Sequence, residues 1–418
     1  MTNIAIIGGG IGGLTAALAL RQFGFEPEVF EQAPAFHDVG AAIAVWPNAM
    51  RILERLGIAG RVMEKAGLIR RVRWLDRDGR LLNHVRIHGT RSDAEATNRA
   101  RQTDSPAAAL HRADLQSILL QALPSTSIHL REAFLGQQQA GEKIEVHFAG
   151  GDSIACDVLI GADGIHSRVR EQLVDTTPPT DRGYSVWRGI SPVRPKDFEA
   201  NTAVEIHGRG QRFGIGPLDL GRTGWWATAN RSVNDTPVLS ERHADEKSHT
   251  DAKNPSASRP DNTQSELLKM FEDWCHPVLE LLKTTPSNSI LRTEAFDRPS
   301  NRNWGGGSLT LLGDAIHPTT PNLGQGGCMA IEDAFVLARC LHKYGVTEHA
   351  LRTYERVRYP RTAAVTRYSR LYGVLGQWEN TFAAGLRGQI LSLLPETLMR
   401  RLMRIVFDYD ANQVRLED

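Results

Sequence analysis

Apolar and polar positions at the start of the chain follow the order strand, helix, strand. Residues 3–8 (NIAIIG) form a short apolar run that is typical of a buried strand. Residues 8–24 (GGGIGGLTAALALRQFG) place alanines and leucines on one face and end at Gly24, which predicts a helix with a glycine stop. Residues 26–32 (EPEVFEQ) predict a second strand, so the pattern indicates a βαβ unit.

The rest of the pattern predicts a second domain and a helical end. Residues 184–229 alternate as strands and turns do, and we expect them to form a β-rich, antiparallel domain. Two polar stretches predict a loop or insertion at residues 88–108 and a mobile surface insertion at 231–264. Further elements are expected as strands and turns at residues 72–87, a helix at 111–123, strands at 144–148 and 157–164, and mostly helix from about 327.

Composition and charge exclude several classes of protein. The 418 residues include 49 Lys and Arg against 48 Asp and Glu, so the net charge of +1 gives no basic field for nucleic acid. A hydrophobic fraction of 41% and a charged fraction of 23% are ordinary for a globular enzyme. No apolar run reaches membrane-spanning length and no signal peptide precedes the first strand, so we expect a cytoplasmic protein. The scattered Cys156, Cys275, Cys328 and Cys340 show no zinc spacing, and no metal site is predicted.

Gly8, Gly10 and Gly13 form a G-x-G-x-x-G motif between the first strand and its helix. The first glycine permits a tight turn, the second lets a pyrophosphate approach the backbone, and the third lets the helix pack on the strand. The pyrophosphate then lies at the positive helix N-terminus. Glu31 closes the second strand, where a carboxylate can bind ribose hydroxyls. Together these features predict dinucleotide binding.

Two later strand ends narrow the choice of dinucleotide. Residues 157–170 (DVLIGADGIHSRVR) end a buried strand at Asp163–Gly164, and residues 309–327 (LTLLGDAIHPTTPNLGQGG) end another at Gly313–Asp314. Each is a turn signal by itself. Three such strand ends in one chain suggest one long ligand across several strand termini. FAD is long enough for this, whereas NAD in a simple dehydrogenase is not.

The runs GGGIGG, ADGIHSRVR and GDAIHPTTPNLGQGG resemble the class A FAD-dependent monooxygenases, a group with salicylate and urate hydroxylases and zeaxanthin epoxidase-like enzymes. The resemblance extends from about residue 3 to about residue 375. It implies an α/β fold, in which a Rossmann-type FAD-binding domain carries an inserted β-rich (α+β) substrate domain and a helical C-terminus. The expected segments are 1–71, 109–178 and 301–372 for the FAD domain, 72–108 and 179–300 for the substrate domain, and 373–418 for the C-terminal region.

The resemblance also implies which residues contact FAD. The glycines and Glu31 hold the adenosine half, Asp314 contacts the ribitol and pyrophosphate, and Arg112 approaches from the substrate domain. Asp163–Gly164 is associated with both FAD and transient NAD(P)H contacts. The run NLGQGG brings backbone N–H groups to the flavin pyrimidine ring, where a helix N-terminus stabilises the anionic reduced flavin. The full expected set is Gly8, Gly10, Gly12, Gly13, Glu31, Gln32, Ala42, Val45, Arg112, Leu135, Asp163, Gly164, Asp314, Pro321, Gly324, Gly326 and Gly327.

The implied chemistry is reduction of FAD by NADH or NADPH, addition of O2 at flavin C4a, and hydroxylation of an aromatic or heteroaromatic substrate by the hydroperoxide. A second G-x-G-x-x-G is absent, so NADH and NADPH are not distinguished. Epoxidation or another oxidation of an isoprenoid-like apolar substrate is an alternative. A non-catalytic binding protein like the Rab GDP-dissociation inhibitors, which share the architecture, is another. We expect a monomer or homodimer with a small aromatic substrate and O2 as partners, and no nucleic acid.

On the substrate side, the candidate pocket walls are Trp187, Arg188, Arg212, Trp225 and Trp226. Urate-hydroxylating relatives pair an arginine at the position of Arg212 with their anionic substrate, which makes Arg212 one catalytic candidate. His317 is the other, either as a general base or in a structural hydrogen bond. The tryptophans are either pocket walls or core of the β-rich domain, and Trp46 is expected near the isoalloxazine edge.

Asn322 and the C-terminus depart from a simple match. Urate-hydroxylating relatives carry an aspartate where this chain has Asn322, and an amide cannot accept a proton as a carboxylate does. This weakens a urate assignment. Residues 386–410 (LRGQILSLLPETLMRRLMRIVFDYD) are basic and amphipathic. They predict packing onto the FAD domain or a partner subunit, with interfacial membrane attachment as the alternative.

Overall fold

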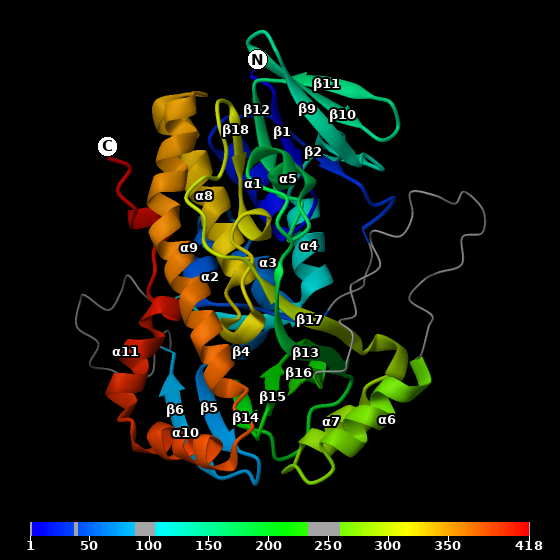
Figure 1. Cartoon of the computed structure of the whole chain (residues 1–418), viewed down its shortest axis with the longest axis vertical. Coiled ribbons are helices and arrows are strands. Elements are labelled where there is room, and N and C mark those ends of the chain that lie inside the picture. The colour runs from blue at the N-terminus through cyan, green and yellow to red at the C-terminus, as the bar shows by residue number, and fades with distance from the viewer. Residues whose placement is uncertain (1, 37–40, 88–104, 233–259, 418) are drawn as a thin grey trace.

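A parallel sheet forms the part of the molecule that carries the N-terminus (Figure 1). The computed structural model describes residues 2–36, 41–87, 105–232 and 260–417. The strand order is β18-β12-β1-β2-β8, and every residue of β1 and β12 is buried, which explains their unbroken apolar runs. The strands are β1 (Ile4–Ile7), β2 (Pro27–Glu31), β8 (Ile128–Leu130), β12 (Val158–Gly161) and β18 (Leu309–Leu311).

Helices from distant parts of the sequence cover this sheet (Figure 1). Gly12 lets α1 lie close to α8, because a Cβ at Gly12 would stand 2.8 Å from Leu312 and 3.2 Å from the Ala330 methyl. Three separate segments of the chain thus contribute to one domain, and the predicted fold class is confirmed. The helices are α1 (Ile11–Gln22), α2 (Pro47–Arg55), α3 (Ala59–Glu64), α4 (Arg112–Gln121), α5 (Arg168–Leu173), α8 (Gly326–Tyr344) and α9 (Glu348–Gly376).

The second domain is built on a sheet with strand order β17-β13-β16-β15-β14-β5-β6. Only the β5–β14 pair is parallel among the described strand pairs of this sheet. Helices α6 (Pro260–Met270) and α7 (Val278–Thr284) lie beside it. The strands are β5 (Arg71–Asp76), β6 (Leu81–Arg86), β13 (Thr180–Ser191), β14 (Thr202–His207), β15 (Gln211–Pro217), β16 (Thr223–Asn230) and β17 (Leu291–Asp297).

Two small antiparallel sheets complete the fold. The sheet β3-β7-β4 lies between the two large sheets, and β11-β10-β9 lies beside β2 and α5. Their strands are β3 (Ala42–Val45), β4 (Gly67–Ile69), β7 (Ala107–His111), β9 (Phe134–Ala140), β10 (Lys143–Phe148) and β11 (Ser153–Cys156).

Helices at the C-terminal end run along the outside of both domains (Figure 1). Helix α9 extends past the predicted boundary between residues 372 and 373, so the FAD domain and the C-terminal region share one helix. Two shorter helices, α10 (Thr381–Leu393) and α11 (Glu396–Phe407), follow it. Within the described ranges, no helix is both long and apolar enough to cross a membrane.

The two predicted insertions fall largely outside the described residues, at 88–104 and 233–259. The end of the second one is corrected, because α6 begins at residue 260 and residues 260–264 are therefore helical.

Candidate cofactor and substrate site

The glycines after β1 each meet a different constraint. A Cβ at Gly8 would stand 2.5 Å from the Ala162 carbonyl oxygen, and Gly8 has a positive φ of 109°. A Cβ at Gly13 would stand 2.0 Å from the Gly8 carbonyl oxygen, so this glycine lets α1 pack on the strand end. Gly10 has no heavy atom within 4 Å of its Cβ position. Its backbone therefore borders open space at the start of α1, where a pyrophosphate fits.

Glu31 stands at the end of β2 with its carboxylate fixed by the backbone. Its Oε2 accepts a hydrogen bond from Gly9 N at 2.7 Å, and its Oε1 accepts one from Ala33 N at 2.9 Å. The neighbouring Gln32 is exposed. Leu135 is also exposed on β9, three residues after Glu132, whose N–H donates to the Glu31 carbonyl. These four residues therefore gather at one end of the parallel sheet.

Two aspartates follow β12 and β18, at the edge of the parallel sheet where Gly8 follows β1, and we call this edge the candidate cofactor cleft. Asp163 Oδ2 accepts from Val169 N at 3.2 Å, while its buried Oδ1 has no partner within the described chain. Desolvation raises the pKa of Asp163. Asp314 is solvent-accessible, yet desolvation by the surrounding protein raises its pKa, and His317 and Arg112 oppose that rise.

The glycine run at the start of α8 packs against β3 and against Trp46, the residue after that strand. Gly324 has a left-handed φ of 60°, and a Cβ there would stand 2.9 Å from Trp46 Nε1. A Cβ at Gly327 would stand 2.9 Å from the Ile43 side chain. Only Gly326 faces Asp314, with its Cβ position 3.6 Å from Oδ1. Close protein contacts are therefore one reason for glycine at positions 324 and 327, and the approach of this run to the cofactor stays a prediction.

The remaining predicted cofactor residues differ in exposure. Val45 is buried in the core of the first domain. Ala42 is half-buried and its methyl lies where a Cβ on Gly224 would collide, at 2.6 Å. Pro321 is exposed at the start of the short 3-10 turn that leads to Gly324.

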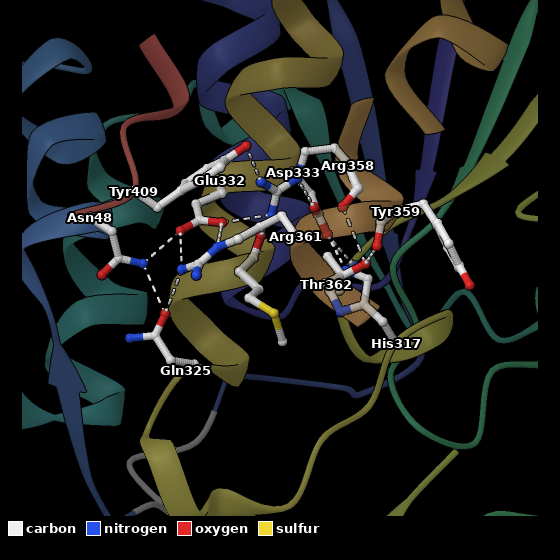
Figure 2. Close-up of polar contacts among 12 residues, drawn as sticks. Asn48, His317, Gln325, Glu332, Asp333, Arg358, Tyr359, Arg361, Thr362 and Tyr409 are labelled. Carbon is white, nitrogen blue, oxygen red and sulfur yellow. Dashed lines mark hydrogen bonds and ion pairs between the residues drawn. The ribbon is translucent and has the colours of Figure 1, made fainter. Parts of the chain in front are cut away.

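A buried charged network lies directly behind these loops (Figure 2). Glu332 and Asp333 on α8 face two arginines of α9, and none of the four is more than 8% exposed. Arg358 Nε lies 2.6 Å from Asp333 Oδ1 and its Nη2 lies 2.7 Å from Glu332 Oε2. Arg361 Nη2 donates to Glu332 Oε1 at 3.1 Å. Burial alone would raise the pKa values of both acids, but the cations outweigh it and lower them, that of Asp333 to about 2.

The network connects both cleft loops to the helix pair. Gly313 N donates to Asp333 Oδ2 at 2.9 Å, which fixes the turn that carries Asp314. Asn48 Nδ2 donates to Glu332 Oε1 at 2.6 Å and to Gln325 Oε1 at 2.9 Å, which fixes the glycine run from α2 (Figure 2). These charged residues therefore position the cleft without facing it.

His317 belongs to this network. Its Nε2 lies 2.5 Å from Asp333 Oδ2, and the ring is buried beside Trp304. Of the two roles considered for His317, a structural hydrogen bond is the one that this geometry favours. Sequence reasoning missed the network, although a signal was present in the acid pair inside the apolar run CMAIEDAFVLA, because buried acids require partners.

Arg212 lies on the face of the seven-stranded sheet that is turned toward α9, and it is fully buried. Its Nη1 donates to Glu205 Oε1 at 3.1 Å, its Nε to Gln377 Oε1 at 3.0 Å and its Nη2 to Asn322 Oδ1 at 2.5 Å. The guanidinium also lies over the rings of Trp226 and Tyr372, at 5.4 and 5.6 Å. Arg212 therefore already has a carboxylate partner.

Asn322 joins this sheet face to the glycine run that follows it. Its Nδ2 lies 3.0 Å from Tyr184 Oη, 2.8 Å from Thr320 Oγ1 and 2.9 Å from the Ser369 carbonyl oxygen, and its two hydrogens are shared among these acceptors. With Arg212 on its Oδ1, the amide is fully engaged. A Cβ at Gly373 would stand 2.5 Å from Asn322 Nδ2, so that glycine lets α9 lie close to it.

The five predicted wall residues divide between the two sheet faces. Arg188, Arg212 and Trp226 share the face toward α9, and Arg188 pairs with Trp226 in the strand register. Trp187 and Trp225 belong to the opposite face, in the hydrophobic core with Phe213 and α7. Of the two roles left open for the tryptophans, the structure thus gives these two the core.

Arg188 differs from Arg212 in its partners. Its Nη1 donates to Thr293 Oγ1 at 2.8 Å, and within the described residues it has no carboxylate partner. Desolvation lowers its pKa, and Tyr184 is the ionisable group that opposes this.

Taken together, the cleft residues fit FAD. The open backbone at Gly10, the fixed carboxylate of Glu31, the unpartnered Asp163 oxygen and the accessible Asp314 form a line of polar groups across several strand ends. The start of α8 lies beside Asp314, at one end of that line. An elongated dinucleotide has hydroxyl and phosphate groups that suit such a line.

The FAD-binding domain family model matches residues 1–369, and the chain belongs to this family. The aurachin C monooxygenase/isomerase of Stigmatella aurantiaca is 36% identical over 392 residues, which cover 94% of each chain. The 3-amino-4-hydroxybenzoate 2-monooxygenase PtnB3 of Streptomyces platensis is 35% identical over 377 residues, covering 89% of this chain and 87% of that protein.

Among solved structures, Klebsiella pneumoniae HpxO in complex with FAD and uric acid superposes with a TM-score of 0.83. The two are 26% identical, and the match covers 97% of each chain. The protein is thus a flavoprotein monooxygenase of the aromatic hydroxylase family. The alternative of a non-catalytic binding protein is set aside.

Proposed function

We propose that the protein uses NADH or NADPH and O2 to hydroxylate an aromatic or heteroaromatic ring. When bound, FAD supplies the oxygen-transfer chemistry. Relatives named for 3-amino-4-hydroxybenzoate and for complex formation with uric acid support a ring-containing substrate. The proposal keeps Gly8, Gly10 and Glu31 on the adenosine half and Asp314 on the middle of the cofactor.

The observation that carries this proposal is the position of Asn322. It precedes the glycine run of α8 and bonds both Tyr184 and Arg212 of the seven-stranded sheet. The sheet face with Trp226 and Arg188 therefore lies next to the loop that we assign to the flavin. A substrate ring between them would lie against Trp226, and the packed domains would exclude water from it.

We infer that Asn322 and Arg212 orient neighbouring side chains and do not transfer protons. Asn322 has no proton-accepting carboxylate, and both ends of its amide are engaged. Arg212 is paired with Glu205, so its role is to hold Asn322 and Trp226 in place. We therefore assign the substrate contacts to Arg188, Tyr184 and Trp226.

The test begins with the absorbance spectrum of the purified protein, which is expected to contain flavin bands. Under anaerobic conditions, NADH and then NADPH are added with phenolic, purine and isoprenoid compounds in turn. We expect phenolic or heteroaromatic compounds to accelerate flavin reduction and, with 18O2, to gain one labelled oxygen. Acceleration by isoprenoid compounds alone would move the assignment to the apolar alternative. Bound flavin that no nicotinamide reduces would refute the proposal.

A further inference from the structure

Helix α10 turns its charged residue toward the protein and its large apolar residues toward solvent, which is the opposite of a typical surface helix. Arg387 is its one charged residue, and it points inward, where it is 8% exposed. Its guanidinium donates to the carbonyls of Gly376 at 2.8 Å, Leu375 at 3.0 Å and Gly208 at 2.5 Å. These bonds fix the rotation of α10 about its axis, so the other side must face outward.

The outward side of α10 is apolar. Phe382 and Leu393 are each 80% exposed, and Leu386 and Ile390 between them are 40% and 49% exposed. Their spacing of four, four and three residues places them on one stripe of the helix. A helix of a water-soluble surface normally carries charged and polar residues there.

Helix α11 continues this surface with Leu398 and Leu402, which are also exposed. Asn83 of β6 holds the junction of the two helices, because its Nδ2 donates to the carbonyls of Leu391 at 2.6 Å and Leu394 at 2.8 Å. Both helices therefore lie against one edge of the molecule (Figure 1). We call Phe382, Leu386, Ile390, Leu393, Leu398 and Leu402 the α10–α11 surface.

Exposed large hydrophobic residues are concentrated in the C-terminal helices. Of the twelve large hydrophobic residues that are exposed in the described part of the chain, nine lie between Tyr368 and Leu402. Scattered surface leucines need no explanation, but a concentration of this kind marks a contact surface.

Charge identifies the kind of partner. The arginines near this surface do not all contribute to its charge, because Arg370 pairs with Asp297, Arg404 pairs with Asp408 and Arg387 is buried. Arg400 and Arg401 on α11 are exposed and have no carboxylate partner within the described ranges. A second copy on this surface would bring like charges together, whereas an anionic lipid surface would attract them. Apolar side chains beside arginines are the composition of helices that lie in a membrane interface.

We propose that the α10–α11 surface docks on an anionic phospholipid bilayer as a peripheral, non-spanning contact. Phe382 and Leu393 enter the boundary between headgroups and acyl chains, and Arg400 and Arg401 meet the lipid phosphates. The contact is independent of the reaction proposed above. Helices α10 and α11 follow α9 in the chain, and it is α9 that contacts the candidate site, because its Gly373 and Gly376 pack on Asn322 and Arg212.

The test is co-sedimentation of the FAD-loaded protein with sucrose-filled vesicles of phosphatidylcholine, with or without phosphatidylglycerol. We expect binding to the anionic vesicles and at least a tenfold weaker partition for the double variant Phe382→Ser, Leu393→Ser. The matched control is Val193→Ser, which removes an exposed apolar side chain outside this surface and should bind as the parent does. The variant Arg400→Gln, Arg401→Gln should lose the preference for anionic lipid.

Two results would overturn the proposal. One is a parent protein that stays in the supernatant with anionic vesicles at low salt. The other is self-association that depends on Phe382 and Leu393, seen by light scattering, without vesicle binding, which would identify a second copy as the occupant. Flavin content and NAD(P)H oxidation are recorded for each variant, so a failure of the proposed reaction is scored separately from a failure of docking.

Discussion

The two faces of the seven-stranded sheet perform different tasks with the same strands. On one face, Trp225 is 2% exposed and stacks on Phe213 at 5.5 Å, within the core beside α7. On the other, the next residue, Trp226, lies under the guanidinium of Arg212. Adjacent residues of a strand point to opposite faces, so Trp225 packs in the core while Trp226 belongs to the candidate site.

The difference lies in how each face is stabilised. The core face buries aromatic surface and needs few partners for polar atoms. The site face buries Arg212 and Glu205, which are tolerated there because each is hydrogen-bonded. The first face should respond to loss of volume, and the second to loss of a charge partner.

The largest effect is expected on the core face. Trp225→Ala removes a fully packed ring and its hydrogen bond to Thr285, which lies at 2.8 Å. The free energy of unfolding should fall by about 3–5 kcal/mol. Urea denaturation monitored by circular dichroism measures this. Trp226→Ala is the paired control, and an equal loss there would show that the two faces do not differ as we describe.

The next effect tests the buried charge on the site face. Glu205→Gln leaves the Arg212 cation without its carboxylate, and we expect a loss of about 3 kcal/mol in the free energy of unfolding. Glu199→Gln is the matched control, because Glu199 pairs with Arg71 and Arg73 in an exposed position and should matter by less than about 1 kcal/mol. Similar losses in both variants would contradict our account of Arg212.

A pH dependence on the site face should be somewhat smaller. Burial lowers the pKa of His207 from 6.5 to about 4, with Arg387 and Arg212 adding to the effect and Glu205 opposing it. Below pH 6.5 the unfolded chain therefore binds a proton that the folded protein refuses, and stability falls as the pH drops toward 4. Between pH 7 and pH 5, the parent should lose about 2 kcal/mol more than His207→Gln. Urea titrations at both pH values measure the difference, and parallel curves would refute it.

The smallest effect on stability is expected at Arg188, because it has no carboxylate partner within the described residues. Arg188→Gln should change the free energy of unfolding by less than about 0.5 kcal/mol. If Arg188 contacts the substrate, this variant should bind 4-hydroxybenzoate roughly tenfold more weakly, with little change for 4-hydroxybenzamide. Flavin difference spectra give both affinities. An unchanged ratio of acid to amide binding would remove Arg188 from the site.

The sequence was sufficient for the first domain because its signals are local. The glycines around Gly8, the acid at Glu31 and the strand ends at Asp163 and Asp314 are visible in short stretches of sequence, and they lie at one edge of the parallel sheet. The division of Trp225 from Trp226 was not predictable in the same way. Alternation separates the two side chains, but only the packing of α7 decides which face is the core.

Partners that lie far apart in the sequence could not be predicted from it. The acids at Glu332 and Asp333 were visible, but their arginines lie 25 to 29 residues later on another helix. Nothing in the spacing of YERVRYPR assigns its arginines to the interior rather than to solvent. Helix α9 continues past the predicted boundary at residue 372, because a helix that contacts two domains has no break in its sequence pattern there.

The dependence of the cleft on α9 has a consequence for how the protein is made. A ribosome completes the first glycine motif within the opening residues, yet Glu332 and Asp333 emerge before Arg358 and Arg361. Until α9 leaves the exit tunnel, the carboxylates of Glu332 and Asp333 lack the arginines that pair with them in the folded protein, so they cannot be buried. The nascent chain should therefore become able to retain its cofactor only late in translation, long after the glycine motif at Gly8, Gly10 and Gly13 has been synthesised.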